Sequence, residues 1–221
     1  GIRLDSGDLA YLSIEARKIL DQNGFKDAVI VASNELDETI ITELKRQGAQ
    51  ITVWGVGTSL VTSANQPALD GVYKLSAIQD EKGEWRDRLK LSEQMVKVSN
   101  PGILQVRRFM HGEMYQADCL YDVRSPLSKT PTLFDPFDPT RTKTIPDYMQ
   151  GIDLLTPILK EGKKVYTFPS LNEVREKTQN ELKHFHGGIK RFINPHQYVV
   201  GMEESAYNKK VNLIRKIRKS K

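Results

Sequence analysis

The sequence has a single cysteine and no long apolar run. Cys119 has no second cysteine with which to form an internal disulfide, which fits a reducing compartment such as the cytoplasm. No window approaches the roughly 18 consecutive apolar residues of a membrane helix, so we expect no membrane-spanning segment. Cys119 lies in a predicted strand, where we expect it to act as a small buried hydrophobic side chain.

Metal and nucleotide motifs are also missing. Of the four histidines, His184 and His186 are closely spaced but have no cysteine or acidic partner at a recognisable interval, so we predict no metal site. The sequence contains no Walker A loop and no complete dinucleotide-binding fingerprint. It opens with Gly1–Asp5, which carries no initiator methionine or targeting signal and has the pattern of a strand, so we expect a fragment of a longer protein.

The composition is that of an ordinary soluble globular protein, with 221 residues, 38% hydrophobic and 28% charged. The net charge of +5 is concentrated at the C-terminus, where a basic cluster could contact nucleic acid or anionic lipid. Apolar residues recur there at helical spacing, which favours an amphipathic last helix with a solvated basic face and no nucleic acid partner. The basic residues are Lys209, Lys210, Arg215, Lys216, Arg218, Lys219 and Lys221, and the apolar ones are Tyr207, Val211, Ile214 and Ile217.

The first 80 residues predict a βαβαβ arrangement. Strands are expected at Ile2–Leu4, Ala28–Ala32 and Gln50–Trp54, with helices over residues 9–23 and between residues 34 and 48. Right-handed crossovers would make the three strands parallel and neighbouring.

The two helices have predicted caps and buried faces. Asn34 is the expected N-cap of the second helix, with Asp37 three residues on, and Gly24 and Gly48 close the two helices. The expected inward residues are Leu9, Leu12, Ala16, Ile19 and Leu20 in the first helix, and Leu36, Ile40, Ile41 and Leu44 in the second.

From residue 81 the alternation fades, and we expect a mixed α+β region over 81–221. Antiparallel strands are predicted at Gln105–Phe109 and Met114–Tyr121, followed by a proline-rich, loop-like stretch over 124–147. Ser170–Lys183 should form a helix, because Ser170 and Glu173 have the spacing of a capping box. Its expected inward residues are Leu171, Val174 and Leu182.

Polar and glycine-rich segments follow all three predicted parallel strands: Arg3–Asp8, Ser33–Glu38 and Gly55–Ser59. In parallel βα architectures, functional groups lie at the carboxyl ends of the strands. Because neighbouring parallel strands end at the same edge, the three segments should meet on one rim.

The third segment has the composition of a phosphate-binding loop. Gly55 and Gly57 would let backbone N–H groups approach an anion, while Thr58 and Ser59 add hydroxyl donors. A lone G-x-G-T is also what an ordinary strand-to-helix turn looks like. The sequence therefore leaves both interpretations open.

Arg3 and Asp5 flank Leu4, so in a strand they point to the same side. They form either a structural ion pair or two separate functional groups. In the second case Arg3 would bind a carboxylate, and Asp5 would hold a ribose hydroxyl or stabilise positive charge on a sugar carbon. Ser6, Asp8 and Asn34 could equally cap helices.

Together these segments resemble the nicotinate phosphoribosyltransferases, a type II phosphoribosyltransferase family. The matches are Gly1–Leu9, Ala32–Glu38 and Trp54–Thr62, with weaker ones at Gly71–Leu75 and Lys97–Arg107. The resemblance implies that residues 1–80 are the C-terminal portion of an irregular βα barrel. Residues 81–221 would be an α+β region that completes a second domain.

The resemblance also implies an enzyme of NAD biosynthesis by pyridine nucleotide salvage, a glycosyltransferase that acts as a ligase. Its members join nicotinate to phosphoribosyl pyrophosphate, giving nicotinate mononucleotide and pyrophosphate, with coupled ATP hydrolysis and Mg²⁺. By resemblance, Arg3 binds nicotinate, and Gly55, Gly57 and Thr58 hold phosphate. Asp5 is the implied catalytic residue, and the implied pocket also contains Ser6, Asn34 and Ser59.

Two family features are not found in this chain. The phosphorylated histidine and the aromatic clamp for the pyridine ring would precede Gly1, so we expect the chain alone to be inactive. A barrel cut here bares a sheet edge and an apolar face, which predicts a need for the N-terminal half or for a homodimer. A nicotinamide-using enzyme remains an alternative, because an arginine can also donate to an amide oxygen. A non-catalytic module that binds a phosphorylated metabolite is a second alternative.

Overall fold

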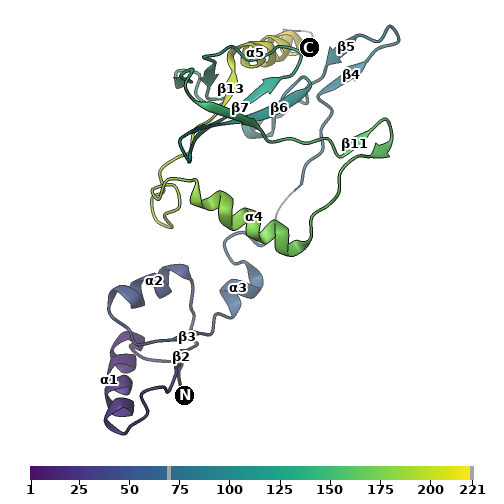
Figure 1. The fold of residues 1–221 in the computed structure, drawn as a ribbon. Helices are drawn as coiled ribbons and strands as arrows, with labels where there is room; N and C mark the ends of the chain where they lie inside the picture. Colours follow the sequence, from purple (N-terminus) through teal and green to yellow (C-terminus); the bar gives the residue numbers. More distant parts are fainter. Residues whose placement is uncertain (69–70, 220–221) are drawn as a thin grey trace. The chain divides into compact units, whose positions relative to one another are not determined.

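The computed structural model describes residues 1–68 and 71–219, and it divides into two compact units, Gly1–Val72 (unit 1) and Tyr73–Lys221 (unit 2) (Figure 1). The architecture is α/β, with parallel strands in unit 1 and a mixed sheet in unit 2. The boundary between the two units lies between residues 72 and 73, whereas the sequence pattern predicted it between residues 80 and 81. No helix of the described part is long and apolar enough to cross a bilayer.

Unit 1 has the predicted βαβαβ order. Its strands pair in parallel in the order β1-β2-β3. The strands are shorter than the sequence pattern indicated. The elements are β1 (Ile2–Leu4), α1 (Leu9–Gln22), β2 (Ile30–Ala32), α2 (Glu38–Arg46), β3 (Val53–Trp54) and α3 (Thr58–Thr62).

The core of unit 1 is built from the side chains of β2 and the facing sides of α1 and α2. Ile30 and Ala32 are fully buried, and Leu9 and Leu44 pack with them. The prediction was wrong for Leu12, Ile19 and Ile40, which are 36%, 60% and 39% exposed.

The side of α1 that faces the core includes a polar residue that the pattern could not place. Ser13 is completely buried because its hydroxyl donates to the Ala10 carbonyl (2.9 Å) and accepts from the backbone N–H of Gln50 (3.0 Å). With Ser13 inward, the helix is rotated so that Leu12 and Ile19 lie at the edge of the buried face.

The N-cap of α2 is Asp37, and the prediction of Asn34 was wrong. The Asp37 carboxylate accepts a hydrogen bond from the backbone N–H of Ile40 (2.7 Å). Asn34 lies three residues earlier, where its side-chain oxygen accepts from the N–H of Glu35 (2.9 Å). Asn34 therefore belongs to the loop that leads from β2 to α2.

Replacing Asp37 with alanine should lower the free energy of unfolding by about 1 kcal/mol, because one N–H of the first turn loses its acceptor. Urea denaturation of the chain measures this. Asp27→Ala is a matched control, since Asp27 is exposed and shows no side-chain hydrogen bond within the described residues. Equal effects of the two substitutions would contradict the assignment of the cap.

Unit 2 is organised around a six-stranded mixed sheet in the order β10-β6-β7-β13-β8-β9. Its strands are β6 (Leu104–His111), β7 (Met114–Asp122), β8 (Thr132–Phe134), β9 (Thr142–Thr144), β10 (Gln150–Asp153) and β13 (Val200–Glu203). Two small hairpins pair β4 (Ala77–Gln79) with β5 (Trp85–Asp87) and β11 (Leu159–Lys160) with β12 (Lys163–Lys164). The 3₁₀ turn η1 (Met95–Lys97) and the helices α4 (Leu171–Lys183) and α5 (Glu204–Lys219) complete the unit.

The predicted hairpin of unit 2 is confirmed as β6 and β7, which pair antiparallel around Gly112. Cys119 lies in β7 and is fully buried, as expected, and burial raises the pKa of its thiol to about 12. The proline-rich stretch is mostly loop but contains the short strands β8 and β9, which pair with each other.

Helix α4 begins with the predicted capping box of Ser170 and Glu173. Its expected inward residues are wrong, because Leu171, Val174 and Leu182 are 83%, 44% and 49% exposed. The helix is attached to the sheet through a polar residue instead. The Glu181 carboxylate accepts from the Tyr115 hydroxyl at 2.8 Å and lies 3.5 Å from the Arg108 guanidinium.

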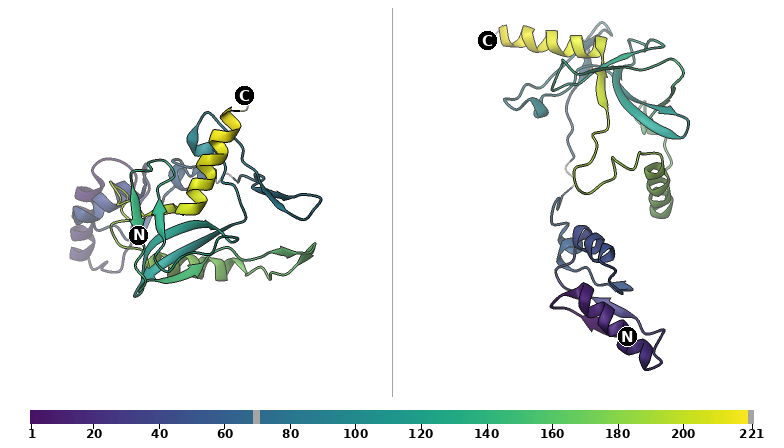
Figure 2. Two further views of the ribbon diagram at one scale, coloured as in Figure 1. Left: turned by 90° about the horizontal axis from the view of Figure 1, so that it is seen from above. Right: turned by 90° about the vertical axis from the view of Figure 1, so that its left-hand side faces the viewer.

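Helix α5 follows β13 directly and lies against the six-stranded sheet, as both views of Figure 2 show. Tyr207 stacks on Phe134 of β8, with ring centroids 5.1 Å apart. Its basic residues are not all solvated as predicted. Lys210 is buried and donates to the Asn100 side chain (2.8 Å), and Lys209 donates to Asp122 (2.7 Å).

Of these two lysines, Lys210 is part of the interior of unit 2 and Lys209, 30% exposed, lies at its margin. Burial lowers the pKa of Lys210. Arg215, Lys216 and Arg218 are exposed, as expected of a solvated face, and Lys221 lies outside the described residues.

Candidate active site

The three segments that follow the parallel strands begin at the same edge of the sheet. Leu4 pairs with Ala32, and Ala32 pairs with Trp54, so the last residues of β1, β2 and β3 are in register. The expected convergence of the strand ends is therefore present in the backbone of unit 1.

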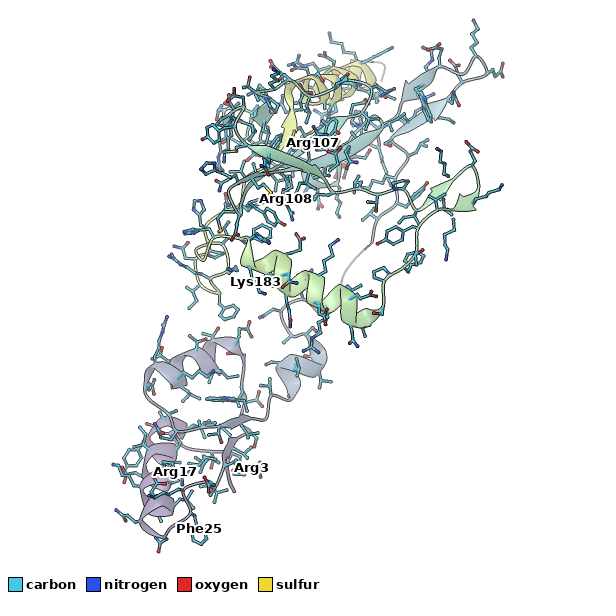
Figure 3. The ribbon with its side chains drawn as sticks, in the orientation of Figure 1. Arg3, Arg17, Phe25, Arg107, Arg108 and Lys183 are labelled. Atoms are coloured by element: carbon cyan, nitrogen blue, oxygen red, sulfur yellow. The ribbon has the colours of Figure 1, made fainter. Side chains whose placement is uncertain are left out.

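Arg3 lies on the face of the sheet that the helices leave open. It is in register with Val31 and Val53, whereas the alternate residues Ile30 and Ala32 point into the core. The Arg3 guanidinium donates to the Ser33 hydroxyl at 2.7 Å and lies 3.0 Å from the Asp5 carboxylate. Figure 3 labels Arg3 on this strand.

The ion pair between Arg3 and Asp5 is solvent-exposed. Their side chains are 60% and 53% exposed, so the pair contributes little to folding, about 0–1 kcal/mol. Both side chains are therefore accessible to a ligand. Ser6 is exposed as well, and it makes no side-chain hydrogen bond to any described residue.

The loops after β2 and β3 line a common hollow of about 140 Å³. Arg3 reaches this hollow indirectly, through its hydrogen bond to Ser33. Arg3, Asp5 and Ser6 are not among the lining residues. The lining comprises Ser33, Asn34, Glu35, Leu36, Gly55, Gly57, Thr58 and Ser59.

Gly55 allows the end of β3 to approach the end of β2 closely. A Cβ at this position would lie 3.1 Å from the Cβ of Ser33 and 3.3 Å from the carbonyl oxygen of Ala32. The Gly55 N–H also donates to that carbonyl at 2.7 Å. A side chain here would push apart the two loops that form the hollow.

Gly57 and the two hydroxyl residues form the open side of the hollow. Apart from its two chain neighbours, no atom of the described residues lies within 4 Å of where a Gly57 Cβ would be, so the backbone there is accessible. The side-chain hydroxyls of Thr58 and Ser59 make no hydrogen bond within the described residues. Together these groups can donate to an anion without breaking an existing contact.

The charge of the site is mixed. Glu35 is the single charged residue among those that line the hollow, while Arg3 and Asp5 lie beside it. No cluster of three or more histidine, cysteine, aspartate or glutamate side chains that could hold a metal ion occurs among residues 1–68 and 71–219. The described side chains thus do not form a protein cage for Mg²⁺.

The chain also matches known proteins in sequence and structure. The family described as nicotinate phosphoribosyltransferase C-terminal domain matches residues 103–210. Nicotinate phosphoribosyltransferase of Bacillus subtilis is 38% identical over 99% of this chain, and that of Homo sapiens is 30% identical over 92%. The chain is homologous to the nicotinate phosphoribosyltransferases. The resemblance predicted from the sequence motifs is thereby confirmed.

The fold agrees with this homology. The crystal structure of human nicotinic acid phosphoribosyltransferase is similar to 97% of this chain, with a TM-score of 0.64 and 25% sequence identity. This chain spans 45% of the length of the Bacillus subtilis relative and 40% of the human structure.

Sequence reasoning missed three residues of the hollow in this nicotinate phosphoribosyltransferase homologue. Ser33, Glu35 and Leu36 lie in a segment predicted to be functional, but none of them was predicted individually to line a site. Ser33 could have been predicted from the sequence, because it is the first residue after β2. In the structure it lies next to Gly55, the first residue after β3. Leu36 is buried as predicted, at 3% exposure, but in the loop before α2 and not within the helix.

Proposed function

We propose that this chain is part of an enzyme that transfers a phosphoribosyl group to nicotinate in NAD salvage. The supporting observation is the shared hollow, in which the loops after β2 and β3 meet beside Arg3. The homology to nicotinate phosphoribosyltransferases supports the choice of substrates. In the reaction, the pyridine nitrogen bonds to the ribose C1′, and the bond from C1′ to the pyrophosphate oxygen breaks.

In this proposal, the carboxylate of nicotinate and the phosphate of the ribosyl substrate each have a matching group in unit 1. Arg3 presents a planar guanidinium that suits the carboxylate of nicotinate. The backbone N–H groups and hydroxyls of Gly57, Thr58 and Ser59 hold the phosphate, and Gly55 keeps their loop close to the loop after β2. Asn34 and Ser6 are proposed to contact substrate hydroxyls from the same rim.

Asp5 is proposed to act on the sugar. Positive charge develops at C1′ as the pyrophosphate leaves with the bonding electron pair, and a nearby carboxylate stabilises that charge. The pairing of Asp5 with Arg3 at 3.0 Å also keeps the carboxylate at the rim before substrate binds. Arg3 then has two partners, Asp5 and the nicotinate carboxylate.

ATP and Mg²⁺ belong to the proposal only through the family. No cluster of three or more candidate metal ligands occurs among the described residues, and we assign no metal-binding residue in this proposal. The single buried Cys119 agrees with a proposed cytoplasmic location.

The remaining surface of unit 1 supports a proposed partner. Val29 and Val53 are each 44% exposed on the open face of the sheet, and β1 and β3 form its edges, where neither pairs with a further strand of the described residues. We propose that this face and these edges pack against the rest of a βα barrel, supplied by the N-terminal half, and that the enzyme is a homodimer. Unit 2 would then complete the second domain.

The test is product formation. The protein that combines this chain with its N-terminal half should form nicotinate mononucleotide from nicotinate and phosphoribosyl pyrophosphate, and nicotinamide should not replace nicotinate. The 221-residue chain alone should form no product. Binding of both substrates without turnover by the combined protein would instead indicate a non-catalytic binding module. A chain that is active, monomeric and cooperatively folded by itself would contradict the need for a partner.

A further inference from the structure

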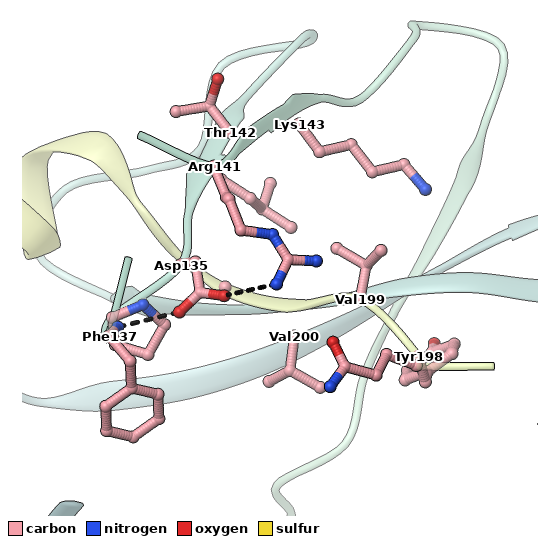
Figure 4. A pocket seen from close by; sticks show the side chains of 12 residues that line it. Asp135, Phe137, Arg141, Thr142, Lys143, Tyr198, Val199 and Val200 are labelled. Atoms are coloured by element: carbon pink, nitrogen blue, oxygen red, sulfur yellow. Dashed lines mark hydrogen bonds and ion pairs between the residues drawn. The ribbon is translucent and has the colours of Figure 1, made fainter. Parts of the chain in front are cut away.

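A second hollow lies in unit 2, on the sheet edge at β9 and the loop over residues 184–199. Three adjoining cavities of about 250, 480 and 500 Å³ share Gln197 and Val199 in their linings. We refer to the three together as the basic hollow. Figure 4 shows the first of them from close by.

The charged residues of the basic hollow are mainly cations. Arg141 lines the first and third cavities, Lys143 the first and second, and Arg191 the second and third. His186 and His196 add ring nitrogens that can donate or accept hydrogen bonds. Asp135 is the single carboxylate in the three linings.

The cations are only weakly engaged by the protein. Arg141 is 63% exposed and lies 4.0 Å from Asp135, at the limit of an ion pair. The Asp135 carboxylate is already occupied by the backbone N–H groups of Phe137 and Asp138, at 2.8 and 3.2 Å. Arg191 makes no hydrogen bond or ion pair within the described residues. In Figure 4 Lys143 extends away from Asp135, and its ammonium donates to the Gln116 carbonyl at 3.2 Å.

The loop that carries Arg191 and the histidines is cross-linked by hydrogen bonds of its own. The backbone N–H of His196 donates to the Gly188 carbonyl at 2.9 Å, and the N–H of Gly188 donates to the His186 ring at 3.1 Å. Asn194 adopts a positive φ of 48°, which asparagine tolerates better than most residues. The Val199 carbonyl accepts from the backbone N–H of Asp118 of β7 at 2.9 Å, which fixes the end of the loop to the sheet.

We propose that the basic hollow binds a small phosphorylated ligand. Two arginines can each form paired hydrogen bonds with phosphate oxygens, and Lys143 adds a third positive charge. Tyr198 and Phe137 in the lining provide aromatic surface for the organic part of such a ligand. The inference concerns unit 2 only and does not depend on the function proposed for unit 1.

Isothermal titration of the protein that combines this chain with its N-terminal half, with inorganic phosphate and pyrophosphate, tests this inference. Pyrophosphate should bind more tightly than phosphate, and succinate, which lacks phosphorus, should not compete. The double variant Arg141→Gln/Arg191→Gln should weaken pyrophosphate binding about 100-fold, because two charge-assisted partners are lost.

Two controls distinguish binding in the basic hollow from a general charge effect and from binding in unit 1. Arg175→Gln/Arg215→Gln removes two exposed arginines of unit 2 from outside the hollow and should leave binding unchanged. Thr58→Val weakens the phosphate site proposed for unit 1, so a separate pyrophosphate-binding event should remain in this variant and be lost in Arg141→Gln/Arg191→Gln. Equal weakening by the first control would show a general charge effect and overturn the proposal.

Further outcomes would also overturn it. If Thr58→Val abolishes pyrophosphate binding and Arg141→Gln/Arg191→Gln does not, the ligand binds in unit 1, which supports the function proposed there. If a short RNA oligonucleotide binds more tightly than pyrophosphate and loses that binding in the double variant, the hollow serves a nucleic acid and not a small ligand. Unchanged circular dichroism of each variant shows that folding is retained.

Discussion

Replacing Asp122 with alanine should lower the free energy of unfolding of unit 2 by about 2–3 kcal/mol. The Asp122 side chain is 1% exposed and accepts hydrogen bonds from Arg124 at 2.5 Å and from Lys209 at 2.7 Å. Removing the carboxylate leaves Arg124 and Lys209, which are 27% and 30% exposed, with Asp87 as their remaining anion. Asp122 ends β7 and Lys209 belongs to α5, so the substitution also weakens the attachment of the helix to the sheet.

Urea denaturation measures this effect in a Trp54→Phe background, where Trp85 of unit 2 is the remaining tryptophan of the two. Asp147→Ala is the matched control, because Asp147 is exposed and makes no side-chain hydrogen bond within the described residues. A loss below about 1 kcal/mol for Asp122→Ala, the usual value for a surface pair, would show that the network contributes little.

The same network gives unit 2 a pH dependence. Burial alone would raise the pKa of Asp122, but the hydrogen bonds from Arg124 and Lys209 outweigh it and hold that pKa well below its usual range. The carboxylate therefore stabilises the folded state fully above its unfolded pKa of about 3.9, and this stabilisation is lost as pH falls towards the folded value. The stability of the Asp122→Asn variant should consequently fall less steeply below pH 4 than that of the wild type.

The sequence predicted the order of elements in unit 1 because apolar periodicity and glycine stops are local signals. It failed on the exact buried faces, since these depend on partners distant in the chain. Ser13 is buried because Gln50, 37 residues away, supplies a donor to its hydroxyl. The same limit applies to Lys210, whose partner Asn100 lies 110 residues away.

The sequence matches around Asn100 and Gly102 reflect packing that only coordinates reveal. Gly102 has a positive φ of 114°, and a Cβ there would lie 2.5 Å from a carboxylate oxygen of Asp122. Asn100, two residues earlier in the same segment, accepts from the Lys210 ammonium. The residue types of this short motif are thus required by the interior of unit 2.

The candidate site of unit 1 was more accessible to sequence reasoning than the basic hollow of unit 2. The rule that functional groups follow parallel strands depends only on strand order, and it located Asn34, Gly57 and Thr58 at one hollow. The basic hollow is formed by an irregular loop and a short strand. Neither has a periodicity that predicts which side chains will meet.

Replacing Arg3 with glutamine in the protein that includes the N-terminal half should lower kcat/KM for nicotinate about 100-fold. The proposed guanidinium-carboxylate contact is lost together with the hydrogen bond to Ser33, while Thr58 and Ser59, which are proposed to hold phosphate, make no hydrogen bond to Arg3 within the described residues. KM for phosphoribosyl pyrophosphate should change little. Steady-state kinetics with each substrate varied in turn separates the two effects.

The comparison with other variants distinguishes a binding role for Arg3 from a purely structural ion pair. Arg46→Gln, which removes an exposed arginine of α2, should leave both kinetic constants unchanged. Thr58→Val should raise KM for phosphoribosyl pyrophosphate and spare nicotinate, the reverse of Arg3→Gln. Because the pair of Arg3 and Asp5 is exposed, a structural role predicts equal and small effects on both substrates. Equal effects of Arg3→Gln on both substrates, with Asp5→Asn behaving identically, would assign the pair to the fold and remove Arg3 from the proposed nicotinate site.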